Sequence, residues 1–413
     1  MLDSREVLEA ERMVLQDVTG SGSLRSSRPL PSQVGVRPEA GSAHLAITSV
    51  FGPPLELTTW SGAPANVGRA LASLGYRISG IQPRFDTLAK SLLAGRHILA
   101  GHVGFPRGET VRRSAASRRH CARIVARELE RIGAEHVLHT GTFDLPALQR
   151  NQRVRHYLFC DHTWDLARRH HAHSGTFDGH QMEEFEALER TSYAQMHHIF
   201  TFGRYVRDNL VVHYGIDPAR VTVAGSGMGR IHPYAGMKDY VRGPLLFVAK
   251  HLFIEKGGRL VLDAFRIVRK RRPDVRLVIV GSETHRTLAG DQDGVTFHAH
   301  LPWEELERLY HQAVLLVQPM LNDPWGQVYL EALVSRTPVV GLRRNGLPEI
   351  LEGGRYGFLI DVANPETLAD AVVEALSEPA RLAEMGLSGQ RHVLANYSWE
   401  RTAAQIHEVI SAT

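Results

Sequence analysis

The sequence predicts an α/β fold made of two doubly wound domains that face each other across a cleft. The chain has 413 residues, which exceeds the size at which one hydrophobic core usually keeps growing, so we expect two domains of roughly 200 residues each. Short apolar runs rich in β-branched and aromatic residues alternate with helical patterns, which is typical of a parallel sheet covered by helices. Because the alternation occurs twice in tandem, it predicts two such sheets.

The first unit starts after an N-terminal extension, residues 1–41. Residues 21–41 are rich in Ser, Arg, Pro and Gly and poor in bulky apolar side chains, which predicts a partly disordered linker. We assign residues 42–235 to the first domain. Its strands are expected at 45–50, 76–81, 136–141, 154–160, 197–202 and 221–225, and its helices at 66–74, 112–132, 182–193 and 205–214.

The second unit, residues 236–395, repeats this alternation of strands and helices. Residues 230–244 contain Pro and Gly and lack helical or strand periodicity, so we expect the hinge there. Residues 396–413 form a final helix. The strands of the second domain are expected at 245–250, 275–281, 314–319, 337–342 and 356–361, and its helices at 258–271, 302–311, 325–335 and from Pro365 onward.

The composition excludes several classes of protein. The hydrophobic fraction is 43% and the charged fraction 22%, and no apolar run reaches the ~20 residues that cross a bilayer. No secretory signal is visible at the N-terminus. Two cysteines, Cys121 and Cys160, cannot build a disulfide framework. We therefore expect a cytoplasmic protein, and its net charge of +4 favours anionic partners mildly.

A pair of lysines follows the first strand of the second unit. Doubly wound sheets bind ligands beyond the carboxyl ends of their strands. The strand at 245–250 ends in Lys250, and Lys256 stands beside Gly257 and Gly258 at the start of the next helix. Two cations at a helix N-terminus suit a pyrophosphate, because the free amides there add partial positive charge. Lysines at helix starts are also common as plain surface charge, so this pair alone does not establish a site.

The segment 322–331 is more informative. Asp323 followed by Pro324 is a good N-cap and first-turn pair, so we expect a helix that starts there and has free amides at its first residues. Helical rise would place Glu331 about 12 Å from Asp323, a span comparable to a nucleotide sugar from hexose to ribose. Carboxylates commonly accept hydrogen bonds from paired sugar hydroxyls. The amides expected to face the ligand belong to Gly326, Gln327 and Val328.

Residues 250–376 resemble the retaining GT-B glycosyltransferases of the GT4 type, glycosyl transferases group 1. The resemblance rests on Lys-x5-Lys-Gly, on the acid-x7-Glu block and on residues 337–351. It implies that Lys250 and Lys256 bind the diphosphate of a nucleotide-sugar donor and that Glu331 binds its ribose. Asp323 and the adjacent amides would bind the sugar. The first basic residue is more often Arg and the first acid more often Glu in that family, which leaves the sugar open. The donor residues implied are Lys250, Lys256, Asp323, Trp325, Gly326, Gln327, Val328 and Glu331.

The first half resembles the family more loosely. Gly62 lies in a loop similar to the one that approaches the donor phosphates, and the alternative is an ordinary loop ahead of a helix. His162 follows the strand at 154–160, where related enzymes carry a His near the reacting carbon; a loop histidine with no role in the reaction is the alternative. With Asp323, Lys250 and Lys256, His162 completes the expected catalytic set. The tail from 396 resembles a helix that crosses back to the first domain.

Two patterns resemble metal sites but have simpler explanations. Asp291 and Asp293 have Asp-x-Asp spacing, yet Gly294 follows them, so we interpret them as a turn. A histidine cluster lacks His-x3-His spacing on a helix and a carboxylate partner, which favours a His-rich acceptor loop. The sequence therefore predicts no metal. The histidines of this cluster are His170, His171, His173 and His180.

Four arginines recur every four residues in the helix expected at 112–132. They form one basic stripe, which we interpret either as a solvated helix face or as a surface for peripheral contact with anionic lipid. No motif supports nucleic-acid binding. The four are Arg119, Arg123, Arg127 and Arg131.

The sequence thus predicts an enzyme that transfers a sugar from a nucleoside-diphosphate sugar to a glycan, lipid-linked or small-molecule acceptor. Retention of anomeric configuration is implied by the resemblance, and no cofactor or metal is expected. A sugar-nucleotide epimerase or phosphorylase on the same fold is one alternative. A non-catalytic, lectin-like or regulatory sugar-nucleotide binder is another. The intact set of charged residues favours the enzyme, and the base, sugar and acceptor stay open.

Overall fold

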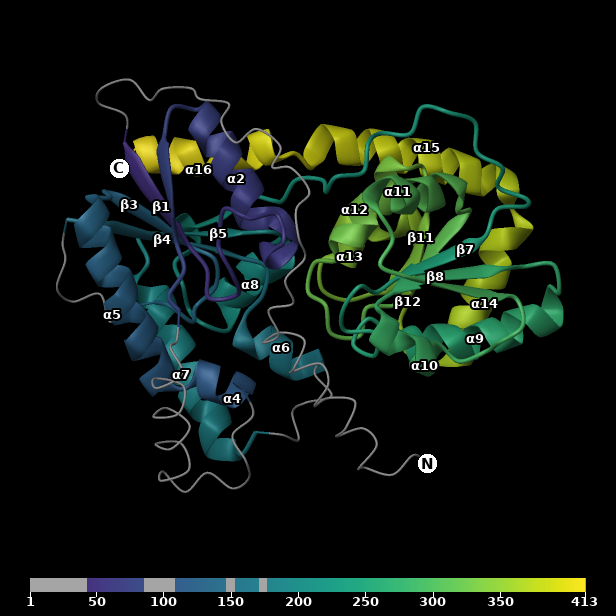
Figure 1. Ribbon diagram of the computed structural model, residues 1–413, viewed down its shortest axis with the longest axis horizontal. Coiled ribbons are helices and arrows are strands. Elements are labelled where there is room, and N and C mark those ends of the chain that lie inside the picture. The colour runs from purple at the N-terminus through teal and green to yellow at the C-terminus, as the bar shows by residue number, and fades with distance from the viewer. Residues whose placement is uncertain (1–42, 85–107, 146–152, 171–176, 413) are drawn as a thin grey trace, which may run out of the picture.

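The computed structural model describes residues 43–84, 108–145, 153–170 and 177–412, which form two α/β domains (Figure 1). The first domain contains one parallel sheet in the order β2-β1-β3-β4-β5-β6. The N-terminal extension lies outside the described residues. The strands are β1 (His44–Thr48), β2 (Arg77–Ile81), β3 (His136–His139), β4 (Arg155–Cys160), β5 (His198–Thr201) and β6 (Val221–Val223). The helices are α2 (Ala63–Ser73), α4 (Gly108–Arg113), α5 (Ala115–Ile132), α6 (Trp164–His170), α7 (Gly179–Gln195) and α8 (Arg204–Val212).

The second domain contains a parallel sheet in the order β12-β11-β10-β7-β8-β9. Its strands are β7 (Leu245–Val248), β8 (Leu277–Gly281), β9 (Val295–Ala299), β10 (Leu315–Val317), β11 (Val339–Leu342) and β12 (Gly357–Ile360). Its helices are α9 (Gly258–Arg271), α10 (Arg286–Ala289), α11 (Trp303–Gln312), α12 (Gln327–Val334), α13 (Leu347–Ile350), α14 (Pro365–Ser377) and α15 (Pro379–Asn396). The fold is therefore the doubly wound α/β pair that the alternating pattern predicts.

The strand order fixes where a ligand is expected. In the second domain the chain winds from β7 through β8 to β9 in one direction, and from β10 through β11 to β12 in the other. Neighbouring strands β7 and β10 thus form the topological switch point, beyond whose carboxyl ends open α/β sheets bind ligands. The loops that follow β7 and β10 are the two segments that carry the predicted lysines and acids.

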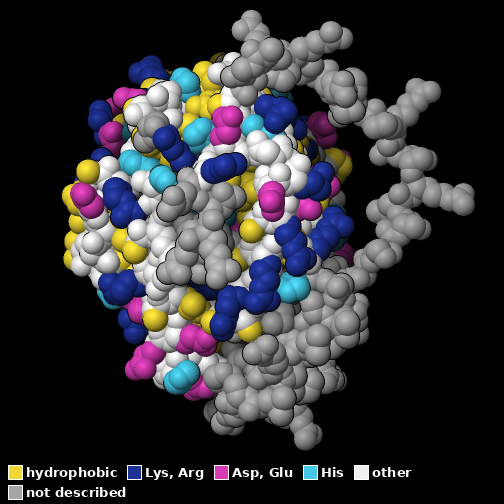
Figure 2. All heavy atoms as spheres, turned by 90° about the vertical axis from the view of Figure 1, so that its left-hand side faces the viewer, with side chains coloured by type: hydrophobic (Ala, Val, Ile, Leu, Met, Phe, Trp, Pro, Cys, Tyr) yellow, Lys and Arg dark blue, Asp and Glu magenta, His cyan; other side chains and the backbone are white. Residues whose placement is uncertain are grey.

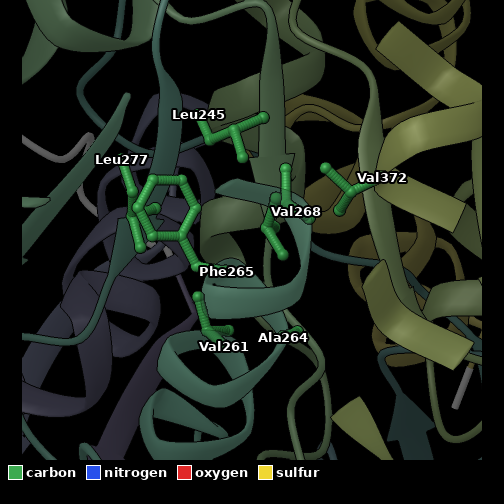
Figure 3. A pocket seen from close by; sticks show the side chains of 8 residues that line it. Leu245, Val261, Ala264, Phe265, Val268, Leu277 and Val372 are labelled. Atoms are coloured by element: carbon green, nitrogen blue, oxygen red, sulfur yellow. The ribbon is translucent and has the colours of Figure 1, made fainter. Parts of the chain in front are cut away.

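The core of the second domain is apolar on both sheet faces. Strands β7 and β8 are fully buried, as is typical of parallel strands covered by helices on each side. Figure 3 shows a small apolar cavity under these strands, where side chains of α9 and α14 meet them. The scaffold behind the switch point is therefore a packed core. The labelled side chains are Leu245, Val261, Ala264, Phe265, Val268, Leu277 and Val372.

The C-terminal helices join the two domains. Helix α15 lies on the second domain, and α16 (Trp399–Ser411) lies on the first (Figure 1). There α16 packs against α2, and the Tyr76 hydroxyl and the His407 ring are hydrogen-bonded at 2.9 Å. Within the described ranges, no helix combines the length and the apolar character that crossing a lipid bilayer requires.

Candidate functional site

The two predicted lysines lie together at the switch point of the second domain. Lys250 follows β7, and its Nζ lies 3.7 Å from the ring centroid of Trp303, at the start of α11. Lys256 comes from the loop before α9, and its Nζ lies 3.4 Å from Oδ2 of Asp323, in the loop after β10. The Lys256 side chain is only 17% exposed. The loops that follow β7 and β10 therefore bring two cations and one acid together at a partly desolvated position.

Glu331 lies on α12 behind these lysines. Its side chain is buried, and Oε2 accepts a hydrogen bond of 2.9 Å from the Tyr310 hydroxyl. Burial raises the pKa of Glu331, while the Tyr310 hydrogen bond and the charges of Lys250 and Lys256 oppose that shift. Oε2 thus already accepts one hydrogen bond, and both carboxylate oxygens can accept more. Such a carboxylate is suited to bind paired hydroxyl groups. Lys250, Lys256, Asp323 and Glu331 thus form one cluster.

With Arg230 nearby, three cations face the two acids of this cluster. Desolvation lowers the pKa of Lys250, and the nearby charges of Arg230 and Lys256 lower it further, against the effect of Glu331. Desolvation and the charges of Lys256, Lys250 and His300 also lower the pKa of His251. Cations that disfavour one another's charge provide a site for an anion.

The expected start of the helix at Asp323 is wrong. Helix α12 begins at Gln327 and its N-cap is Gly326, with φ of 72°. Asp323 therefore caps no helix, and its side chain pairs with Lys256 instead. The reason is that Trp325 is buried, so the segment turns to insert this side chain and reaches the helix only through the left-handed Gly326. The spacing of about 12 Å that was drawn from helical rise does not apply.

The remaining predicted donor residues lie around this turn. The Trp325 ring is buried between the domains, against Phe202 and stacked on Tyr205. The Gln327 side chain donates a hydrogen bond of 2.6 Å to the carbonyl of Gly227. Val328 is buried in the core. The structure thus joins Gln327 to the interdomain linker, keeps Gly326 as the N-cap of α12 and places the side chains of Trp325 and Val328 in packing positions.

The first domain presents a strained loop and a carboxyl group to this cluster. Gly62 is the N-cap of α2 with φ of 81°, and Trp60 and Ser61 before it also have positive φ, 44° and 52°. Positive φ in non-glycine residues is uncommon and accumulates at functional loops. His162 follows β4 and is half-buried. The indole of Trp60 donates a hydrogen bond to the side chain of Asp161, which lies between β4 and His162.

Asp161 is a site residue that sequence reasoning missed. Desolvation raises its pKa to about 7, and the negative charge of Asp323 adds to the effect. The two carboxyl groups therefore face each other from opposite domains. The signal was available, because Asp161 is the first residue after β4 and the rule on strand ends applies to it.

One tyrosine ties the two sides together. The Tyr205 hydroxyl lies within hydrogen-bond distance of the Asp161 carbonyl in the first domain and, at 3.0 Å, of the Pro324 carbonyl in the second. Beside it, the Arg204 amide donates a hydrogen bond of 2.7 Å to Oε2 of Glu349. The loop before α12 is thus held against the end of β4.

The two metal-like patterns are described only in part. Asp293 is in a turn before β9 and pairs with Arg269, as the turn interpretation requires. His180 belongs to α7, while His171 and His173 lie outside the described residues. In the part of the chain that the structure describes, no three His, Cys, Asp or Glu side chains are grouped to hold a metal ion.

Residues 239–392 match the family model of glycosyl transferases group 1. The second domain is a member of this family. The group 1 domain contains Lys250, Lys256, Asp323 and Glu331, so the cation cluster lies within the matched region. A GDP-mannose-dependent alpha-(1-6)-phosphatidylinositol monomannoside mannosyltransferase of Mycolicibacterium smegmatis is 29% identical over 211 residues, which make up 48% of this chain and 54% of that protein. The chain spans about half the length of the curated relatives it matches.

Solved structures show that the two described domains together have the GT-B fold. Sucrose-phosphate synthase from Thermosynechococcus elongatus superposes with a TM-score of 0.69 at 17% identity, over 90% of this chain and 98% of that one. The Anabaena protein HepE, solved in complex with UDP and glucose, superposes with a TM-score of 0.61 at 15% identity, over 90% of this chain and 100% of that one. Both domains of the GT-B fold are therefore present.

Proposed function

We propose that this chain transfers a sugar from a nucleoside-diphosphate sugar to the hydroxyl group of an acceptor and releases the nucleoside diphosphate. The observation that carries the proposal is the cluster of Lys250, Lys256 and Glu331 at the switch point of the second domain. The ammonium groups bind the diphosphate, and the Glu331 carboxylate accepts hydrogen bonds from the ribose hydroxyls. The complex of HepE with UDP and glucose supports this assignment, as does the GDP-mannose dependence named for the mycobacterial relative.

The reaction follows from these charges. The bond between the sugar C1 and the phosphate oxygen breaks, the acceptor oxygen bonds to C1, and the acceptor proton moves to the departing phosphate. Lys250 and Lys256 stabilise the negative charge that develops on the leaving group, in surroundings where electrostatic stabilisation is strong. Asp323 is proposed to bind the sugar, with His162 and the Gly62 loop facing it from the first domain. We propose retention at C1 on the family resemblance, and no divalent ion is part of the scheme.

The arginine row of α5 supports a surface for anionic acceptors. Figure 2 views the side of the first domain on which α5 lies, where Lys and Arg side chains gather at the surface. All four predicted arginines are exposed, and one of them, Arg131, is paired with Glu128 at 2.7 Å. We propose that this row of arginines contacts the cytoplasmic face of an anionic membrane.

The double variant Arg123→Gln/Arg127→Gln should reduce cosedimentation with phosphatidylglycerol vesicles several-fold. Equal sedimentation of the variant and the wild type would contradict the contact.

One experiment tests the proposed function. Thermal shifts are measured with UDP-, GDP- and ADP-sugars, and the donor that stabilises the protein is then incubated with a panel of acceptors. Free nucleoside diphosphate together with a new glycoside is the expected product. An isomerised sugar nucleotide would show an epimerase instead. A stabilising donor that is never turned over with any acceptor would favour the non-catalytic binder.

A further inference from the structure

The linker between the domains is fixed to the group 1 domain beside the cation cluster. After β6, the carbonyl of Gly227 accepts a hydrogen bond of 2.6 Å from the Gln327 side chain. The next carbonyl, that of Met228, accepts one of 2.9 Å from the indole of Trp399. These contacts join the linker to the first residues of α12 and α16. The position of the residues that follow is therefore set by the second domain and the C-terminal helix.

The next linker residue rests on the ribose-binding carboxylate. A Cβ atom added to Gly229 would lie 2.4 Å from Oε1 of Glu331, so only the main chain of a glycine fits here. Arg230 comes next in the linker, and its charge acts on Lys250.

Arg230 shares an aromatic ring with one of the predicted lysines. Its guanidinium carbon lies 5.4 Å from the ring centroid of Trp303, and Nζ of Lys250 lies 3.7 Å from the same centroid. Arg230 is exposed, and no ion pair to it occurs among the described residues. Contact with an aromatic face stabilises a cation only modestly at an exposed site. Two cations on one ring therefore form an arrangement that an anion between them would stabilise.

We propose that Arg230 is a third phosphate-binding cation of the donor site, and that Trp303 holds its guanidinium beside Lys250 until the ligand binds. The inference rests on the proposed function, because its ligand is the diphosphate of the donor. A guanidinium can donate two parallel hydrogen bonds to a phosphate, which an ammonium group cannot. Because Arg230 belongs to the linker, the bound diphosphate also contacts the segment that connects the domains.

The test compares Arg230→Gln, Arg230→Lys and a matched control, Arg276→Gln, in the full chain. Arg276 is exposed immediately before β8, at the amino end of the strands, so its variant removes the same charge away from the site. Binding of UDP, GDP, ADP and inorganic pyrophosphate is titrated by calorimetry at low and moderate salt. We expect Arg230→Gln to weaken both the preferred nucleotide and pyrophosphate about 10-fold, as for the loss of a charge-assisted hydrogen bond. Arg230→Lys should recover part of that loss, and Arg276→Gln should match the wild type.

Each contrary outcome has a separate meaning. If the wild type binds a nucleotide and Arg230→Gln binds it equally well, the inference is wrong and the proposed function stands. If Arg230→Gln weakens the nucleotide but not pyrophosphate, Arg230 contacts the nucleoside and the phosphate assignment is overturned. If the wild type binds neither nucleotides nor pyrophosphate, the proposed function fails and the inference fails with it.

Discussion

The carboxyl ends of the strands carry lysines in the second domain, whereas in the first domain they carry carboxyl and aromatic groups. Lys250 and Lys256 follow β7 at the switch point of the second sheet. On the opposite side, Asp161 follows β4 and receives a hydrogen bond from Trp60. Both sheets are parallel and six-stranded within the described residues, so the fold alone does not cause the difference.

In the transfer reaction that we propose, this contrast divides the work between the two domains. Cations at the carboxyl ends of strands can bind a diphosphate. Carboxylates and aromatic rings can bind neutral hydroxylated molecules, which donate hydrogen bonds and present apolar faces. Asp323 is the exception, because it places a carboxylate on the cationic side and faces Asp161. The reacting sugar is expected where these two acids meet. Substitutions on each side should therefore have different consequences.

The largest effect is expected for Glu331→Ala on the cationic side. Loss of the carboxylate removes the acceptor for two hydroxyl groups, and hydrogen bonds to charged groups contribute about 1.5–3 kcal/mol each. We expect affinity for the stabilising sugar nucleotide to fall about 100-fold or more, so its thermal shift disappears. The exposed Glu305→Ala on α11 serves as the control and should behave like the wild type.

Loss of stability would not explain that result. Because burial raises the pKa of Glu331, the ionised carboxylate opposes folding at neutral pH. The isosteric Glu331→Gln should therefore unfold at the same temperature as the wild type or higher while still losing affinity. An unchanged thermal shift in either variant would refute the ribose assignment.

A smaller effect is expected for Lys256→Gln. The variant removes one cation and leaves Asp323 without its partner at 3.4 Å, so the acid then repels the diphosphate. We expect about a 10-fold loss of affinity, since one charge-assisted contact is lost, and a weaker dependence on salt. Calorimetry at two ionic strengths measures both. Lys270→Gln, at the far end of α9, is the control, and an equal loss there would show that only net charge matters.

The sequence predicted the second domain in more detail than the first. Lys250 and Lys256 stand at fixed offsets from a strand of continuous apolar residues, so the end of that strand could be located from composition alone. The approach of Glu331 to these lysines required the strand order, in which β7 and β10 are neighbours. The start of α12 was predicted wrongly because the burial of Trp325 depends on Phe202 and Tyr205, which belong to the other domain.

The sequence did not predict the site residues of the first domain and the linker for a related reason. Asp161 has no distinctive spacing, and its perturbed pKa arises from desolvation and from Asp323, which is distant in sequence. The position of Arg230 likewise depends on contacts of the linker with Gln327 and Trp399. Local patterns fix strands, helices and their ends, whereas contacts between the domains require the folded chain.

Asp161→Asn should change the pH dependence of stability. In the folded chain the pKa of Asp161 is raised to about 7, compared with about 3.9 for an unperturbed Asp. The wild-type free energy of unfolding therefore falls as pH rises from about 4 to about 7, because only the folded state keeps the proton, and this contribution is constant at higher pH. The variant lacks this contribution. It should be more stable than the wild type at pH 8, by about 1 kcal/mol or more, and the difference should shrink toward pH 5.

Denaturant unfolding at pH 5, 6, 7 and 8 measures this difference. Asp239→Asn is the control, because backbone hydrogen bonds from Val241 and Arg242 lower the pKa of Asp239, so its difference from the wild type should not change between pH 5 and 8. The stability that Asp239 contributes is present above its unfolded pKa and is lost on acidification. A difference between Asp161→Asn and the wild type that is independent of pH would show that Asp161 does not titrate in the cleft.

The smallest effect is expected for Tyr205→Phe, which removes the hydroxyl that bridges the domains. This hydroxyl lies 3.0 Å from the Pro324 carbonyl and also contacts the carbonyl of Asp161. One lost hydrogen bond should lower the free energy of unfolding by about 1 kcal/mol. Tyr240→Phe is the matched control, because its hydroxyl donates at 2.6 Å to the Arg336 carbonyl within the second domain. Both variants should lose similar stability, but only Tyr205→Phe should increase proteolytic cleavage of the interdomain linker. Equal cleavage of the two variants would mean that the domains are held together without the Tyr205 hydroxyl, and that Asp161 and Asp323 keep their separation through the Trp325 packing alone.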